Sequence, residues 1–68
     1  MKVGSPRLIR LPEVEKRTGL RKSTVYEYIA RNKFPKPVQL GAKAVAWVEA
    51  EVNEWINKRI QQRDQVPA

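Results

Sequence analysis

The sequence contains no cysteine and no histidine, and its single aspartate is Asp64. Without cysteine the chain forms no disulfide and has no thiolate chemistry, and without histidine as well it lacks the usual zinc ligands. Catalytic general bases are most often histidine, and a nucleophile needs a nearby base to be activated. We therefore expect no enzyme activity, no metal and no cofactor, and the lack of cysteine fits a reducing cytosol.

Long apolar runs are also missing. The longest run covers the five residues 44–48, whereas a membrane-spanning helix needs about 20 residues. Lys2 is not followed by an apolar stretch, so no signal peptide is predicted. We expect no contact with a membrane.

Positive charge is concentrated in the first two thirds of the chain. Fourteen Lys and Arg residues outnumber seven Asp and Glu residues, so the 68 residues carry a net charge of +7. Residues 1–46 hold eleven basic and three acidic side chains, a net +8, whereas residues 47–68 hold three basic and four acidic ones, a net −1. Charge that served only solubility would not gather in one part, so this distribution favours a surface that binds a polyanion.

Two short helices are predicted around a glycine. Pro12 suits the first position of a helix and Gly19 suits the left-handed residue that ends one, which predicts a helix over residues 12–17. A second helix must begin within a few residues, where Ser23 and Thr24 are natural caps. Two short helices joined by a glycine-containing turn are typical of a helix-turn-helix.

The second helix has its own start and stop signals. Thr24 and Glu27 have the spacing of a capping box. Asn32 and the two prolines that follow it end the helix. The basic residues around the two helices are Arg17, Arg21, Lys22, Arg31, Lys33 and Lys36.

A β-hairpin and a longer helix follow. Residues 38–40 and 45–47 alternate in polarity and Gly41 supplies a turn, so we expect a hairpin with Lys43 near its tip. A short strand near Ile9 would complete a three-stranded sheet, since a lone hairpin is only marginally stable. Apolar residues then recur at helical spacing, which predicts a last helix from about residue 49 to residue 63.

These elements predict an α+β fold that is mainly α-helical: a small winged helix-turn-helix with a short hairpin wing and a C-terminal helix. We expect one domain over residues 7–63, between a flexible N-terminus at 1–6 and a flexible tail at 64–68. The predicted core consists of Val14, Leu20, Val25, Tyr28, Ile29, Trp47, Val52, Trp55, Ile56 and Ile60. A dimer face formed by Ile56 and Ile60 is the alternative to their burial.

A series of short motifs runs along almost the whole chain. The first half contains Leu11-Pro12-Glu13-Val14, Thr18-Gly19-Leu20 and Ser23-Thr24-Val25-Tyr26. The second half contains Phe34-Pro35-Lys36-Pro37-Val38, Leu40-Gly41, Val45-Ala46-Trp47, Glu51-Val52 and Trp55-Ile56. In this order and spacing, over about residues 7–60, the motifs resemble the AlpA family of prophage regulators.

That family is similar to phage excisionases and to the DNA-binding domain of the MerR regulators. The resemblance implies a winged-helix fold, a bacterial host, and transcriptional control of prophage or mobile-element genes. It implies double-stranded DNA as the partner, with an integrase or RNA polymerase as further candidates, and a cytoplasmic location at the nucleoid. We expect a monomer or weak dimer in solution, with several copies bound to one DNA. Many relatives have a helix-capping serine where this chain has Arg21, so we expect Ser23 or Thr24 to cap the second helix.

The N-terminal part of the second helix of a helix-turn-helix lies in the major groove. This position predicts that five residues at the start of the second helix face base edges: Lys22, Ser23, Thr24, Tyr26 and Glu27. Ser23 and Thr24 have the alternative of only capping the helix, and Glu27 that of only completing the capping box. The residues expected at phosphates or on the flank are Arg21, Arg31, Lys33 and Lys36, together with Lys43 at the wing. A merely solvated charge is the alternative for this second set.

Three functions stay open. The first is a sequence-specific DNA-binding transcriptional regulator. The second is an excisionase-like architectural factor that bends DNA for recombination, which uses the same fold and charge. The third is an RNA-binding or protein-interaction module. RNA readers stack bases on exposed aromatic side chains, and most of the five aromatic residues here fall at predicted core positions, which favours DNA.

Overall fold

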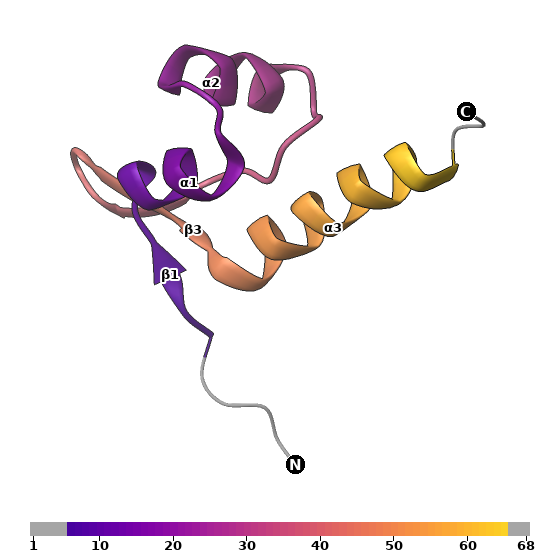
Figure 1. The fold of residues 1–68 in the computed structure, drawn as a ribbon. Coiled ribbons are helices and arrows are strands. Elements are labelled where there is room, and N and C mark those ends of the chain that lie inside the picture. The colour runs from indigo at the N-terminus through magenta and orange to yellow at the C-terminus, as the bar shows by residue number, and fades with distance from the viewer. Residues whose placement is uncertain (1–5, 66–68) are drawn as a thin grey trace.

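The computed structural model describes residues 6–65, in which three helices pack with a three-stranded antiparallel sheet. The elements in chain order are β1 (Leu8–Ile9), α1 (Leu11–Thr18), α2 (Lys22–Ala30), β2 (Val38–Gly41), β3 (Ala44–Val48) and α3 (Glu49–Gln65). Helices α1 and α2 form the helix-turn-helix, and β2 with β3 forms the hairpin (Figure 1). The predicted α+β, mainly α-helical winged helix-turn-helix is confirmed.

The sheet has the strand order β1-β3-β2. Ile9 in β1 pairs with Trp47 in β3, and Val38 in β2 pairs with Ala46 in β3. The register shifts between Gln39 and Gly41, where β2 carries a bulge or similar irregularity. β1 therefore completes the hairpin into a three-stranded sheet, as the sequence predicted.

The hairpin turn differs from the prediction in one detail. Gly41 belongs to β2 and does not adopt a positive φ, and the turn itself is made by Ala42 and Lys43. The irregular pairing of β2 shifts the turn beyond the glycine. Lys43 still lies at the tip of the hairpin.

Helix α1 begins and ends with local signals. Pro12 occupies its first turn, and Gly19 follows it in the left-handed conformation at φ 76°. The N–H of Gly19 donates to the carbonyl of Glu15 at 2.8 Å, which satisfies one of the carbonyls that a helix end leaves open. The helix is one residue longer at each end than the predicted 12–17.

The start of α2 was predicted incorrectly. The residue before the helix is Arg21, in extended backbone, and no side chain caps the helix. Ser23 and Thr24 lie inside the first turn, so neither is the cap. In the preceding turn, Thr18 Oγ1 donates to the Val14 carbonyl at 2.8 Å and accepts from the Leu20 N–H at 3.2 Å. The short turn then leads directly into α2.

The predicted capping box also does not form. Glu27 pairs instead with Arg31, one turn further along α2, at 2.9 Å. Both side chains are more than half exposed, so the pair adds little to stability.

Asn32 ends α2, as its sequence position indicated. It is the single non-glycine residue with positive φ among residues 6–65, at 59°. The N–H of Lys33 reaches back to the Tyr28 carbonyl at 2.7 Å, and that of Asn32 to the Ile29 carbonyl at 3.0 Å. These two bonds are the pattern of a Schellman motif, which fixes the direction of the chain at Lys33.

The core lies where the sheet meets all three helices. Val14, Val25, Trp47 and Val52 are fully buried, and Leu20, Tyr28, Ile29, Trp55 and Ile56 pack partly buried at the margin. Three buried residues, Ile9, Phe34 and Ala46, were not among the predicted core residues.

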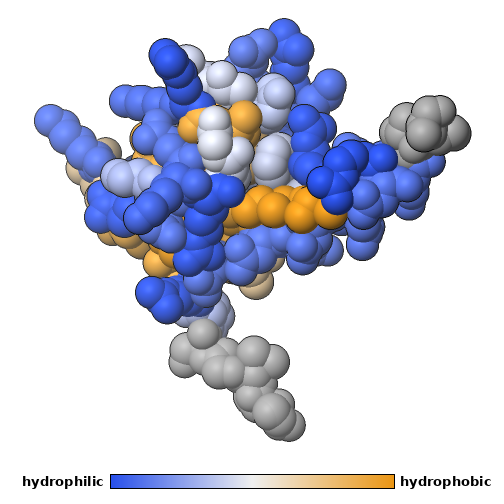
Figure 2. All heavy atoms as spheres, viewed as in Figure 1, coloured by the Kyte–Doolittle hydropathy of each residue, from blue (hydrophilic) through white to orange (hydrophobic). Residues whose placement is uncertain are grey.

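Ile60 is 42% exposed, contrary to its expected burial. The C-terminal half of α3 extends away from the body of the molecule (Figure 1), so the apolar stripe of α3 outruns the core. Figure 2 shows this as an apolar strip along α3 within a mostly hydrophilic face.

The two ends of the chain, which the sequence predicts to be flexible, are described only in part. Helix α3 continues through Asp64 and Gln65, which the sequence assigned to the tail. Pro6 is described and exposed, and residues 1–5 and 66–68 of the two predicted flexible ends lie outside the described residues.

Candidate nucleic-acid interface

One face of α2 is turned to solvent. Lys22, Ser23, Tyr26 and Glu27 are exposed, and Thr24 is half-buried. The spacing of the four exposed residues places them on one side of the helix, opposite the buried side. The structure therefore brings the five candidate base-contacting residues together at the N-terminal part of α2.

Two side chains on this face, those of Tyr26 and Glu27, already make contacts within the protein. The ring of Tyr26 meets Trp47 edge-on, with the ring centroids 6.1 Å apart, and the residue is 38% exposed. Its ring is therefore anchored on the core. Glu27 shares its carboxylate with Arg31, so any base contact by Glu27 competes with that ion pair.

The N-terminus of α2 is electropositive. No side chain caps its first N–H groups, and Arg21 and Lys22 are exposed beside them. Uncapped N–H groups and the positive end of the helix dipole favour an anion at this position. This end of α2 can thus hold a phosphate while the neighbouring side chains reach bases.

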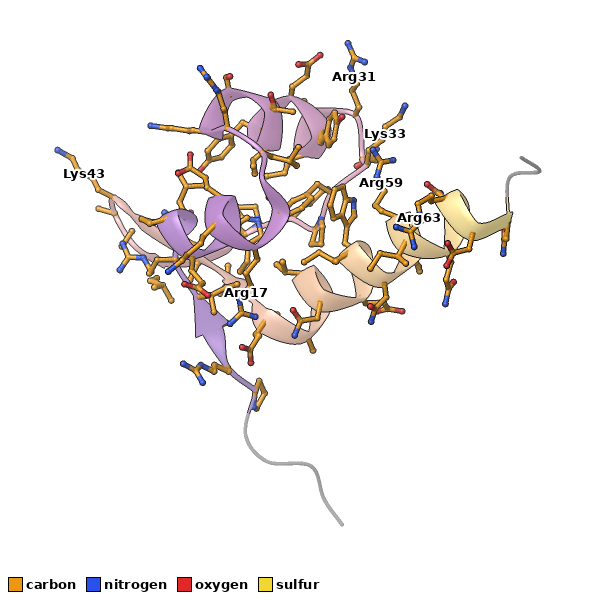
Figure 3. The ribbon with its side chains drawn as sticks, viewed as in Figure 1. Arg17, Arg31, Lys33, Lys43, Arg59 and Arg63 are labelled. Atoms are coloured by element: carbon orange, nitrogen blue, oxygen red, sulfur yellow. The ribbon has the colours of Figure 1, made fainter. Side chains whose placement is uncertain are left out.

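The remaining predicted phosphate contacts lie at the other end of α2 and beyond it. Arg31 and Lys33 are exposed where α2 ends, and Lys36 is exposed in the loop that follows. Lys36 lines an open groove with Glu51 and Glu54, whose negative charges weaken its attraction for a polyanion. In Figure 3, Lys43 lies at the opposite side of the molecule from Arg31 and Lys33, with α2 between them.

Arg17, in the last turn of α1, is engaged by other side chains of the protein. Its guanidinium bonds Glu13 at 2.8 Å and Glu49 at 2.9 Å, and donates to Asn53 Oδ1 at 3.2 Å. Hydrogen bonds to Glu13 and Glu49 raise the pKa of Arg17, and the bond from Arg17 lowers the pKa of Glu13. Arg17 therefore links α1 to the start of α3 and is a poor candidate for a phosphate contact.

The basic residues of α3 were not among the candidates named from sequence. Lys58 lies outside the apolar stripe of α3, whereas Arg59 and Arg63 fall on the stripe side, at helical spacing from Val52 and Trp55. The structure places Arg59 over the ring of Trp55, 5.2 Å from its centroid. The sequence signal that was present is the spacing of Trp55, Arg59 and Arg63, which puts all three on one side of a helix.

Two further searches covered the described part of the chain. Across residues 6–65 no three His, Cys, Asp or Glu residues are grouped as a metal site would require. Within the same range no helix has the length and apolar character to cross a bilayer.

Comparison with known proteins shows the family of the chain. The family model of the prophage CP4-57 regulatory protein (AlpA) matches residues 7–60. The DNA-binding transcriptional activator AlpA of Escherichia coli K12 is 39% identical over 59 residues, covering 78% of this chain and 84% of that protein. The uncharacterised protein ORF88 of Enterobacteria phage P4 is 48% identical over 54 residues, covering 79% of this chain and 61% of that protein.

The chain thus spans less than two thirds of the phage P4 relative. The family match, in contrast, covers β1 through most of α3, which includes the helix-turn-helix and the wing. On this basis the chain belongs to the AlpA family of prophage regulatory proteins.

Proposed function

We propose that this chain is a sequence-specific, double-stranded DNA-binding transcriptional regulator of prophage or mobile-element genes. The observation that carries the proposal is the exposed face of α2, with Lys22, Ser23 and Tyr26 beside an uncapped, basic helix N-terminus. The printed description of the Escherichia coli relative as a DNA-binding transcriptional activator supports it. The proposed role is binding without a catalytic step.

In the proposed complex the N-terminal part of α2 enters the major groove. Lys22 donates to guanine O6 or N7, and Ser23 and Thr24 bond bases or phosphates. Lys43 at the hairpin tip contacts the backbone or the minor groove on one flank. Arg21 positions the helix through a phosphate and carries no sequence information directly.

The first test is a selection of bound sequences from a random duplex library at physiological salt, with unrelated RNA as competitor. Recovery of a motif several base pairs long supports sequence-specific DNA readout. Absence of any motif, with binding lost to RNA, contradicts the proposal and favours an RNA-binding module instead.

The second test separates base readout from backbone contact. Lys22→Ala should cost about 1–3 kcal/mol on the selected site and relax the preference at one position, because a bidentate base contact is lost. Uniform weakening on all sequences would show that Lys22 contacts a phosphate only. Lys43→Ala should shorten the protected DNA at one flank; an unchanged footprint removes the wing from the complex.

The proposal extends to partners and assembly. We propose that the chain is a monomer or weak dimer in solution and that several copies bind one regulatory region, where they contact an integrase or RNA polymerase. Cooperative binding to several sites beside an attachment site, with bending of the DNA, would instead favour the architectural role in excision. Sedimentation of the free protein measures its oligomeric state in solution. Gel shifts on multi-site duplexes measure how many copies bind one DNA and whether they bind cooperatively.

A further inference from the structure

We propose that Lys33 and Arg59, extended by Arg63, form a second phosphate-binding surface that grips the DNA backbone on the flank opposite the wing. We call Lys33, Arg59 and Arg63 the α3 basic cluster. The inference rests on the proposed DNA-binding function and adds α3 to the interface.

Lys33 and Arg59 come together although they lie far apart in sequence. Both line one shallow groove of about 370 Å³, together with Trp55, Lys58 and Gln62. Figure 3 shows Arg31 and Lys33, at the end of α2, on the same side of the molecule as Arg59 and Arg63 of α3. The surface is therefore built by two elements and continues from the exposed end of α2.

Trp55 contacts the backbone of Lys33 and the side chain of Arg59. Its indole N–H donates to the Lys33 carbonyl at 2.7 Å, and the Arg59 guanidinium lies over its ring at 5.2 Å from the centroid. Phe34, the residue after Lys33, is buried and packs edge-on against the same tryptophan at 5.0 Å. A cation that is already positioned loses less conformational freedom when it binds a phosphate.

The charge of the cluster is available to a ligand. Across residues 6–65 neither Lys33 nor Arg59 forms a salt bridge, and both are exposed. Within the described residues Arg63 pairs with its exposed neighbour Asp64 at 2.9 Å, a contact that water and salt weaken. Lys58 is excluded from the cluster because it also lines the neighbouring groove with Glu51 and Glu54, which offset its charge.

The chemistry favours a duplex backbone over single-stranded RNA. Proteins that bind single strands stack bases on exposed aromatic faces. The guanidinium of Arg59 already lies over the Trp55 ring, so the groove offers cations rather than a free stacking face. Such a surface fits phosphates, whose contacts depend on charge and not on base identity.

Lys43 and the α3 basic cluster are spaced so that each can meet the DNA backbone on one side of a major groove. The nine residues of α2 make a helix about 13 Å long, close to the groove width of about 12 Å. Lys43 lies beyond one end of α2 and the α3 basic cluster beyond the other (Figure 3). With α2 in the groove, the wing and the cluster would therefore meet backbone on opposite flanks.

The test measures affinity against salt for the full chain on a duplex that contains the selected motif with extended flanks. Lys33→Ala and Arg59→Ala should each reduce the magnitude of the log–log salt slope by about 0.9, and the double variant by about 1.8, because each removes one phosphate contact. Between about 50 and 200 mM salt, each variant should lose about 3.5-fold less affinity than the wild type. The sequence preference should not change.

Three controls keep the result specific. Arg7→Ala removes an equal charge just before β1, which lies at the far end of the molecule from α2 (Figure 1), and should leave the slope within error. Arg59→Lys keeps the charge and should restore the slope, which a merely structural role of the guanidinium on Trp55 would not do. Thermal unfolding followed by circular dichroism checks that each variant is folded.

Hydroxyl-radical footprints complete the experiment. The Lys33→Ala/Arg59→Ala variant should lose protection on the flank opposite the one lost by Lys43→Ala. If the wild type binds a selected motif while the cluster variants keep its slope and footprint, the inference is overturned and the proposed function stands. If the wild type selects no motif and binds no duplex, the proposed function fails first.

Discussion

The indole N–H of Trp55 donates to the backbone carbonyl of Lys33 at 2.7 Å, across 22 positions of sequence. Trp47 makes the equivalent bond to the carbonyl of Pro35 at 3.0 Å. The two tryptophans thus hold the loop after α2 against α3 and β3, and thereby set where Lys33 lies relative to α3.

Replacement of either tryptophan by phenylalanine tests this arrangement. Trp55→Phe should lower the free energy of unfolding by about 1 kcal/mol, because it removes one partly exposed hydrogen bond and keeps a ring. Trp47→Phe should cost about 3 kcal/mol, because it opens a gap in the core and leaves the Pro35 carbonyl without its partner. Urea denaturation measures both, and equal losses would contradict the difference in burial between the two rings.

Gly19 should be sensitive to any side chain. Its φ of 76° lies in the left-handed region, and a Cβ there would have no atom within 4 Å. Gly19→Ala should therefore cost about 1 kcal/mol through backbone strain alone. Gly41→Ala is the matched control, since that glycine also has open space but no positive φ; a loss as large as that of Gly19→Ala would contradict the argument.

The contact between Glu13 and Arg17 should make stability depend on pH. The hydrogen bond from Arg17 lowers the pKa of Glu13 below its ordinary value of 4.5. A carboxylate with a lowered pKa in the folded state stabilises the fold fully above that ordinary value, and the contribution is lost as pH falls through the lowered pKa.

Glu13→Gln isolates this contribution. The free energy of unfolding of the variant should fall less than that of the wild type between neutral pH and a pH below 4.5. Urea titrations of both proteins at several pH values provide the comparison. If the free energies of unfolding of the two proteins changed with pH in parallel, the contact between Glu13 and Arg17 would contribute nothing to stability.

The two ends of the apolar stripe of α3 should respond differently to substitution. Val52 is fully buried, so Val52→Ala should cost about 2 kcal/mol from lost burial and the cavity left behind. Ile60 is 42% exposed, and Ile60→Gln should change stability by less than about 0.5 kcal/mol. A large loss at Ile60, growing with protein concentration, would indicate that this residue is covered in a dimer.

Local signals explain which parts of the fold were predictable. Gly19 and Asn32 end their helices, and the hairpin lies where alternating residues flank a turn. Each depends on the backbone preference of a residue and its near neighbours. The start of α2 was less predictable, because Ser23 and Thr24 are good capping residues whereas the residue before the helix is Arg21, whose side chain makes no capping bond.

The candidate interface also contains residues that local sequence could nominate and residues that it could not. Lys22, Ser23 and Tyr26 could be nominated from sequence because helix periodicity places them opposite the buried Val25. The apolar period of α3 wrongly continued the core to Ile60, since periodicity does not reveal where the neighbouring elements end. Arg59 had no local signal that pointed to Lys33.

The amino-acid sequence by itself determined the two helices around Gly19, the hairpin with Lys43 at its tip, the basic charge and the family, because each depends on residue type and short-range spacing. Only the tertiary structure decided that Arg17 is engaged by carboxylates, that Ile60 lies beyond the core, and that Lys33 and Arg59 share one surface. The last of these outcomes depends on where Trp55 and Phe34 pack, which brings together residues that local sequence does not relate.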